Sequence, residues 1–246
     1  MIGGRRPPRR ASICIRMAQQ RAAVRLLLLN PNTNATTTKE MVAIAQTAAP
    51  GGVEVEGATA DAGVPLIVDE PALAEAATGV LRTVRQLPAA YDGVIVAAFG
   101  DPGVEPARLL CACPVTGIAE ASIAEAARYG RRFAIVTTTP LLVASIESRV
   151  HSLGFGATFC GVYLTVGETS AVMADPLLLE QALLAGCVRA IGNGAEAIVI
   201  GGGPLAVAAR AISARCPVPL VEPIPAAVHL AHARACELSL PECSAL

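Results

Sequence analysis

Short apolar runs alternate along this chain with longer stretches in which apolar residues recur every three or four positions. The short runs are rich in Val, Ile and Leu, as buried strands are, and the longer stretches have the spacing of amphipathic helices. We expect strands at 24–29, 94–98, 115–118, 133–137, 197–201 and 218–221, weaker strands at 53–58 and 157–164, and helices at 70–86, 120–128, 140–150 and 177–191. This alternation predicts an α/β fold in which helices cover parallel sheets.

The predicted strands form two sets that repeat along the chain. The matching segments are RLLLLNPNT (25–33) with RFAIVTTTP (132–140), YDGVIVAAFGDPG (91–103) with AEAIVIGGGPLA (195–206), and CPVTGI (113–118) with CPVPLV (216–221). All three pairs have an offset of roughly 105 residues, which indicates an internal repeat. We therefore expect two pseudo-symmetric halves, each a small parallel sheet flanked by helices, whose strands point their carboxyl ends at one cleft.

The same segments set the expected domain boundaries. The first half takes residues 24–118 and, after the chain returns, 219–236, while the second half takes 119–218. Residues 1–23 are basic and rich in Pro near their start, and they contain no apolar segment of the kind found in secretory signals. We expect them to be a disordered or non-native N-terminal extension.

The amino-acid composition argues against some kinds of binding partner and cellular location. Hydrophobic residues make up 53% of the chain, but no run reaches the ~18 consecutive apolar residues of a membrane span. A net charge of −1 with only 3% aromatic residues argues against nucleic-acid binding. The eight cysteines form no CxxC pair and have no histidine at metal-ligand spacing, so we expect no metal and a reducing, cytoplasmic location. The high apolar content favours a homo-oligomer.

Polar and glycine-rich segments follow the predicted strands of both halves. Parallel sheets bind ligands outside the carboxyl ends of their strands, where backbone N–H groups are unpaired. We therefore expect a small anionic or amide-bearing ligand there, although tight turns alone would also explain the NPNT and glycine segments. The candidate ligand-binding residues are Asn30, Asn32, Thr33, Ala98, Phe99, Gly100, Thr137, Thr138, Gly202, Gly203 and Pro204.

Four motifs occur in a fixed order, namely NPNT (30–33), FGDPG (99–103), GIAEAS (117–122) and VTTTP (136–140). In these motifs and their order, the chain resembles the aspartate/glutamate/hydantoin racemase superfamily, particularly its hydantoin and allantoin racemase branch. The resemblance implies two α/β halves with the active site between them. It also implies a cofactor-independent isomerase that acts on a small amino-acid-derived carboxylate, amide or cyclic ureide.

A racemase removes a proton from one face of a stereocentre and returns one to the other, so it needs two acid/base groups. In the family that the chain resembles, two thiols have these roles. One thiol directly precedes FGDPG and the other follows the matching strand of the second half, which places them at Ala98 and Gly202. Because neither residue is a cysteine, the resemblance implies a racemase-like enzyme without the usual cysteine pair.

Three carboxylates near the strand ends are the candidate acid/base groups: Asp101, Glu120 and Glu222. Each has a structural alternative, since Asp101 fits a turn, Glu120 fits a helix N-terminus and Glu222 precedes a proline-rich loop. Cys113 and Cys216 precede strands and should lie away from the cleft. A racemase-like isomerase is therefore the predicted function, with a lyase or hydrolase on a similar substrate, or a non-catalytic binder, as alternatives.

Overall fold

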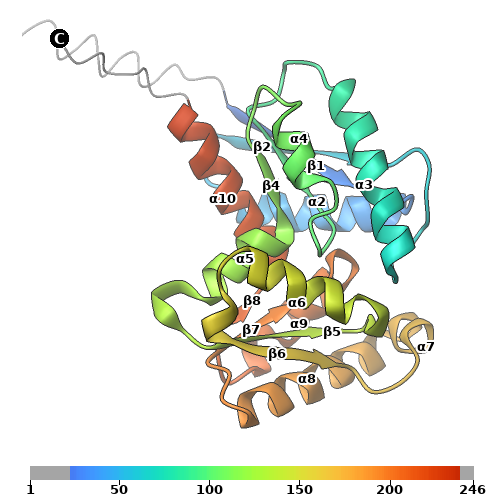
Figure 1. The fold of residues 1–246 in the computed structure, drawn as a ribbon, viewed down its shortest axis with the longest axis vertical. Coiled ribbons are helices and arrows are strands. Elements are labelled where there is room, and N and C mark those ends of the chain that lie inside the picture. Colours follow the sequence, from blue (N-terminus) through green and yellow to red (C-terminus); the bar gives the residue numbers. More distant parts are fainter. Residues whose placement is uncertain (1–22, 239–246) are drawn as a thin grey trace, which may run out of the picture.

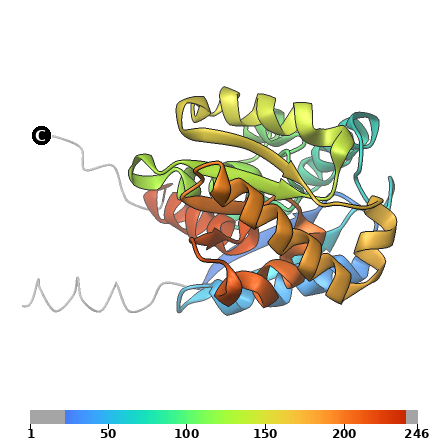
Figure 2. The ribbon, with the colours of Figure 1, turned by 90° about the horizontal axis from the view of Figure 1, so that it is seen from below.

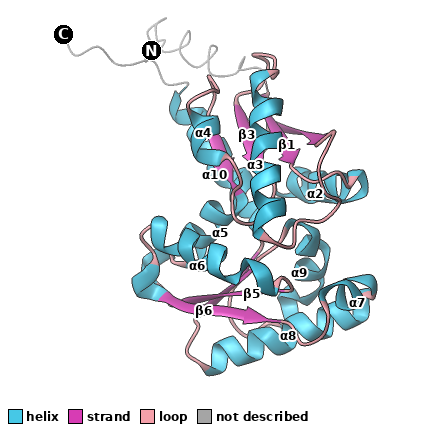
Figure 3. Cartoon of the chain, turned by 45° about the vertical axis from the view of Figure 1, so that its right-hand side comes forward, coloured by secondary structure: helices cyan, strands magenta, loops and turns pink. Residues whose placement is uncertain are grey.

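The computed structural model describes residues 23–238 as two α/β halves, one above the other in Figures 1 and 3. Each half contains a four-stranded parallel sheet, and the strand orders, β2-β1-β3-β4 and β6-β5-β7-β8, are the same when the repeat is applied. This confirms the predicted pseudo-symmetric α/β fold. Residues 1–22 of the predicted N-terminal extension lie outside the described residues. No helix within 23–238 is long and apolar enough to cross a membrane.

The first sheet is sandwiched between two pairs of helices. On one face, Leu27 and Leu29 of its central strand pack with residues of α3 and α4, and on the other face Leu26 and Leu28 pack with α2 and α10. Buried apolar side chains on both faces are what a central parallel strand requires. The elements are β1 (Val24–Asn30), α2 (Ala35–Ala48), β2 (Val53–Thr59), α3 (Glu70–Arg85), β3 (Gly93–Val96), α4 (Val104–Arg108) and β4 (Val115–Gly117), with α10 (Pro223–Leu238) from the end of the chain.

The second sheet is covered in the same way. Figure 2 shows α6 and α8 on opposite faces of it, and the core agrees, because Ile135 packs on the side of α6 and Val136 on the side of α8. The elements are α5 (Ile118–Ala126), β5 (Phe133–Thr137), α6 (Val143–Ser152), β6 (Phe159–Leu164), α7 (Thr169–Ala174), α8 (Pro176–Gly192), β7 (Ala197–Ile200), α9 (Ala206–Ile212) and β8 (Leu220–Val221).

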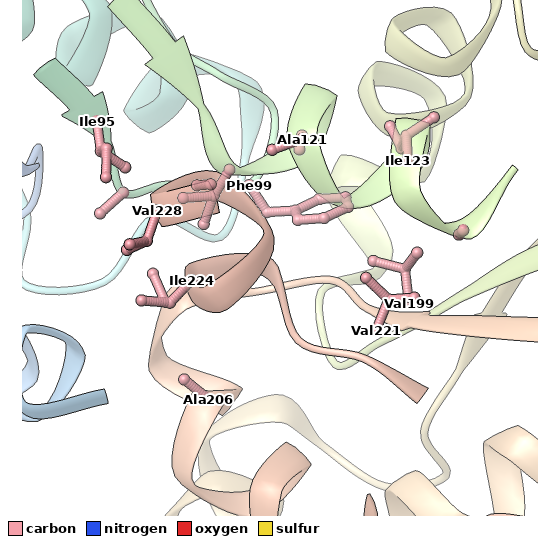
Figure 4. Close-up of a cluster of buried hydrophobic side chains, with 14 of the residues drawn as sticks. Ile95, Phe99, Ala121, Ile123, Val199, Ala206, Val221, Ile224 and Val228 are labelled. Atoms are coloured by element: carbon pink, nitrogen blue, oxygen red, sulfur yellow. The ribbon is translucent and has the colours of Figure 1, made fainter. Parts of the chain in front are cut away.

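One hydrophobic core joins the halves. Phe99, from the loop after β3, belongs to the same buried cluster as Val199 of β7 and Ile224 of α10, and Figure 4 shows these side chains around α5 and α10. Burial of a large apolar side chain contributes roughly 1.5–3 kcal/mol. The halves are therefore held together by the packing of apolar side chains.

The expected strands are confirmed, with shifts at their ends. The run predicted at 94–98 leaves the sheet after Val96, so that Ala97 and Ala98 lie in the loop. The predicted domain boundaries stay a prediction. Within the stretch 219–236 that they assign to the first half, β8 pairs in parallel with β7, and α10 then contacts α2, β3 and β4 of the first half. The helix expected at 140–150 starts as a short 3-10 turn at Pro140 and continues as α6.

Candidate active site between the two halves

A small cavity lies where the strand ends of the two halves meet. The first half contributes the loop after β3 and part of the loop before α3, and the second half contributes the segments after β5 and β7 together with α6 and α7. The position agrees with the rule that parallel sheets bind ligands beyond the carboxyl ends of their strands. The lining residues are Leu66, Ile67, Ala97, Ala98, Phe99, Thr138, Thr139, Leu142, Ile146, Met173, Gly201, Gly202, Gly203, Pro204 and Leu205.

Two glycines allow the loops of the two halves to approach closely. A Cβ at Gly203 would lie 2.9 Å from the carbonyl oxygen of Ala97, and a Cβ at Gly201 would lie 3.3 Å from the ring of Phe99. Both contacts are shorter than ordinary van der Waals packing, and the first is with backbone that cannot rotate away. The segments after β3 and β7 thus face each other across the cavity.

Buried backbone donors without a protein partner occur on both sides of the cavity. Within residues 23–238, the N–H groups of Ala98, Phe99 and Thr138 have no hydrogen-bond acceptor. All three residues are less than a tenth exposed. Buried N–H groups in proteins are almost always paired with protein, ordered water or ligand. These donors are therefore available to the oxygen atoms of a bound molecule.

The threonines at the end of β5 have two different roles, since Thr137 makes a structural contact and the next two line the cavity. The hydroxyl of Thr137 donates to the carbonyl oxygen of Gly201 at 2.8 Å and thereby ties the end of β5 to the loop after β7. Thr138 and Thr139 line the cavity. The Thr138 hydroxyl has only a weak contact, 3.7 Å from the sulfur of Met173 in α7. Thr138 can therefore turn its hydroxyl toward a ligand at little cost.

The NPNT segment forms a closed turn at the end of β1. The side-chain amide of Asn30 donates to Asn32 Oδ1 and to Thr38 Oγ1, both at 2.9 Å, and Asn34 caps α2. Asn30 and Asn32 are buried, and neither they nor Thr33 line the cavity. Their predicted role in ligand binding is untested and stays a prediction, while their contacts show the turn that was the structural alternative.

The carboxylate of Asp101 is fully buried outside the cavity lining. It accepts hydrogen bonds from the backbone N–H groups of Ala119 and Glu120, each at 2.8 Å, and it pairs with Arg149 at 3.0 Å. Burial raises the pKa of Asp101 to about 6, although Arg149 and the two backbone N–H groups favour the charged form. The carboxylate is therefore ionised at neutral pH, and it holds the first turn of α5 in place.

Glu120 and Glu222 also lie outside the cavity lining. Arg108 and Arg234 each donate to Glu120 at 2.6 Å. Burial opposes ionisation of Glu120, but its hydrogen bonds to Arg234 and Arg108 outweigh burial and lower its pKa below the usual value. Glu222 pairs with Arg210 at 3.1 Å near the surface. A catalytic role for the three carboxylates is untested and stays a prediction, but each has a structural partner.

Among the described residues, no cysteine lines the cavity. Burial raises the pKa of Cys111 to about 11 and that of Cys187 to about 12, so both are protonated at neutral pH. Cys113 precedes β4 and Cys216 lies before β8, at the amino ends of their strands as predicted. Residues 23–238 contain no group of three or more His, Cys, Asp or Glu side chains that could hold a metal ion. The cysteines among these residues are Cys111, Cys113, Cys160, Cys187, Cys216 and Cys236.

Sequence reasoning identified part of this lining. The predicted residues that line the cavity are Ala98, Phe99, Thr138, Gly202, Gly203 and Pro204, and those that do not are Asn30, Asn32, Thr33, Gly100 and Thr137. The apolar wall made by Ile67, Ile146 and Met173 was missed. Ile146 could have been found, because the predicted helix starts at a strand end, but Ile67 and Met173 come from segments without a clear pattern.

Comparison with known proteins agrees with this geometry. The family model described as Asp/Glu/Hydantoin racemase matches residues 26–231, which include both halves and the whole cavity lining. The chain belongs to the Asp/Glu/Hydantoin racemase family. The family assignment confirms the resemblance seen in the sequence motifs. That Ala98 and Gly202 occupy the two thiol positions of the family stays a prediction, although both residues do line the cavity.

Relatives within this family are similar along most of their length. The hydantoin racemase of Rhizobium meliloti is 30% identical over an alignment of 215 residues, and the match covers 84% of this chain and 86% of the relative. The structure of allantoin racemase from Klebsiella pneumoniae is similar with a TM-score of 0.80 and 32% identity, covering 91% of this chain and 96% of that one. Allantoin racemase from Pseudomonas fluorescens gives a TM-score of 0.82 at 28% identity, covering 88% and 92%.

Proposed function

We propose that this chain is a cofactor-independent, racemase-like isomerase that binds a small amino-acid-derived carboxylate, amide or cyclic ureide between its halves. The observation that carries the proposal is the cavity at the ends of β3 and β7, with buried N–H donors from Ala98, Phe99 and Thr138. Carbonyl and carboxylate oxygens are the groups that such donors bind. The relatives named hydantoin and allantoin racemases support a cyclic ureide as the first candidate.

The donors also suit the charge that forms during racemisation. Loss of a proton from a carbon beside a carbonyl group places negative charge on the carbonyl oxygen. A preorganised donor aimed at that oxygen lowers the barrier by roughly 3–4 kcal/mol. The apolar side chains of Phe99, Ile146 and Leu205 around these donors exclude bulk water, which strengthens each hydrogen bond.

Racemisation needs a group that accepts and donates a proton, and no lining residue in the described part of the chain has a titrating side chain for this task. The hydroxyl groups of the lining are those of Thr138 and Thr139, and no carboxylate, thiol or imidazole is among the lining residues within 23–238. We infer that water admitted to the cavity removes the proton and returns one from the other face. The pKa values of water as an acid and as a base lie far from neutral pH, so water is a weak acid/base catalyst and we expect slow exchange of the substrate proton.

Deuterium uptake tests this function directly. Single enantiomers of 5-substituted hydantoins and of allantoin are incubated with the protein in D₂O, and deuterium at the stereocentre and optical rotation are followed together. We expect deuterium incorporation and loss of optical rotation to be faster with the protein than without it. The Gly202→Leu variant should abolish the effect, because its Cβ would lie 3.1 Å from the Leu205 side chain of the lining and the rest of the leucine would occupy the space that the ligand needs. Gly192→Leu, on α8 with open space at its Cβ, is the matched control.

One observation favours a second function, which is ligand binding without catalysis. Within residues 23–238 the lining has no side chain that titrates near neutral pH, while the loops and donors that would hold a ligand are present. In that case a hydantoin should raise the melting temperature of the wild type but not of Gly202→Leu, with no deuterium uptake. A lyase or hydrolase would instead change the mass of the substrate, which the same incubations report.

We further propose a cytoplasmic location and a homo-oligomer. Support for association comes from α8, on which Leu177 and Val188 are 69% and 64% exposed. Leu178 beside Leu177 is 43% exposed as well, and contiguous exposed apolar surface marks interaction sites more often than single exposed residues do. Light scattering of the purified protein decides the oligomeric state, and a monomer at micromolar concentration would contradict it.

A further inference from the structure

A cluster of six charged side chains lies beside the cavity. Three carboxylates meet three guanidinium groups, so the cluster has no net charge, and each guanidinium is within 3.0 Å of a carboxylate oxygen. Five of the members come from the first half, α5 and α10, whereas Arg149 comes from α6 of the second half. The members are Asp101, Glu105, Glu120, Arg108, Arg149 and Arg234.

The Arg149 guanidinium connects the two halves through several hydrogen bonds. Its Nε and Nη2 donate to Asp101 Oδ2 at 3.1 and 3.0 Å, and its Nη1 donates to Glu105 at 3.1 Å. Its Nη2 also lies 3.8 Å from Glu120. The Arg149 side chain is only 14% exposed and that of Asp101 is fully buried. A planar guanidinium with three bonds in this setting fixes both distance and direction between its partners.

Both ends of this bridge are close to the cavity wall. Ile146, which lines the cavity, is three residues before Arg149 on α6 and therefore on the same helix face. Asp101 is three residues after Ala98, at the other end of the loop that forms the opposite wall. One ion pair thus connects the α6 wall to the wall formed by the loop after β3.

The loop needs an external constraint. Asp101 has a φ of 53°, an uncommon conformation for a residue with a side chain, and Gly100 beside it has a φ of 109°. Such backbone persists only where its surroundings hold it. The Asp101 carboxylate is held on one side by the N–H groups of α5 and on the other by Arg149.

We propose that Arg149 is a positioning residue that sets the separation of the two cavity walls and so keeps Ala98 and Phe99 in place for the ligand. The proposal rests on the proposed function for its biological meaning, but it makes a statement about geometry that holds with or without catalysis. Loss of Arg149 should free the loop after β3 and open the cavity locally. The two sheets and their hydrophobic cores should remain packed.

A thiol placed in the wall measures this opening without any substrate. In the Ala98→Cys variant, iodoacetamide labelling of the introduced thiol is followed by mass spectrometry of its peptide, and native Cys187 serves as the internal reference. Ala98 is 7% exposed and Cys187 is 1% exposed in a separate core, so thiols at both positions should label slowly. Adding Arg149→Met should accelerate labelling of the introduced thiol at least tenfold and leave Cys187 unchanged.

Two further variants make the result specific. Arg215→Met removes an arginine from an exposed ion pair with Glu180, away from the cavity, and should leave the labelling rate of the introduced thiol within twofold of its parent. Arg149→Lys keeps the charge but loses the planar fork, so about threefold acceleration is expected. If Arg149→Met does not fold, this lysine variant provides the same comparison of the introduced thiol with Cys187.

The outcomes separate this proposal from the proposed function. An unchanged labelling rate of the introduced thiol, or equal acceleration of this thiol and Cys187, would overturn the positioning role, because the second result reports general unfolding. A protein that shows no deuterium exchange and no ligand binding, yet selective labelling of the introduced thiol, would retain the positioning role and lose the function. If the function also holds, Arg149→Met should raise the KM for exchange more than it lowers kcat.

Discussion

Gly117→Ala tests the contacts that hold the loop after β3. A Cβ at Gly117 would lie 2.1 Å from both Cγ and Oδ1 of Asp101, far inside contact distance. The carboxylate must therefore leave the N–H groups of Ala119 and Glu120 and the guanidinium of Arg149. Displacing a buried charge from its partners costs about 3–5 kcal/mol. That is a large share of the roughly 5–15 kcal/mol by which domains are stable.

Urea unfolding followed by far-ultraviolet circular dichroism measures this cost, since the chain has no tryptophan for fluorescence. We expect the midpoint to fall by about 1 M or more with little change in slope. Gly79→Ala is the matched control. Gly79 lies inside α3 and its Cβ would meet no atom within 4 Å, so alanine there should be neutral or stabilising by up to about 1 kcal/mol.

A double-mutant cycle shows whether the Asp101 carboxylate is the cause. Asp101→Gly removes the carboxylate and suits the left-handed backbone at this position. In that background Gly117→Ala should cost less than about 1 kcal/mol, because the obstructing atoms are gone. An equal cost with and without the carboxylate would refute the reasoning and place the clash elsewhere.

Three further predictions concern other parts of the chain. The pKa of Glu120 is lowered in the folded protein, so its ionised carboxylate stabilises the fold above the unfolded pKa near 4.5, and this contribution is lost as the pH falls. The difference in unfolding free energy between the wild type and Glu120→Gln should therefore shrink below about pH 4.5. Asn34→Ala, which removes the cap of α2, should cost about 1 kcal/mol in urea unfolding, and a cost near zero would contradict the cap. Gly203→Ala should weaken stabilisation by hydantoins in thermal melts more than Gly192→Ala does, because its Cβ would press on Ala97.

The central strands were predictable because local sequence determines them. β1, β5 and β7 are short apolar runs whose residues are buried in a sheet covered on both faces, so each run is visible without its neighbours. The helix α2 was not predicted, since its first turn is a row of threonines that hides the apolar spacing of Met41 and Ile44. Its cap at Asn34 is the signal that sequence reasoning could have used.

The site was predictable at its strand ends and not in its charge network. Ala98, Gly202 and Gly203 follow strands and therefore reach the cavity by topology alone. The partners of Asp101 could not be foreseen, because Arg149 is 48 residues away and on the other half of the molecule. The Asp101 carboxylate, which is close to Ala98 in sequence, is turned toward α5 by those partners.

The most direct test of the account is deuterium exchange in the Ala98→Cys/Gly202→Cys double variant. If these positions face one ligand from opposite sides, two thiols there supply the acid and the base that the natural lining lacks among the described residues. We predict that the double variant exchanges the stereocentre proton of a hydantoin or allantoin at least tenfold faster than the wild type and than either single variant. A folded double variant that binds the ureide and exchanges no faster would contradict the account.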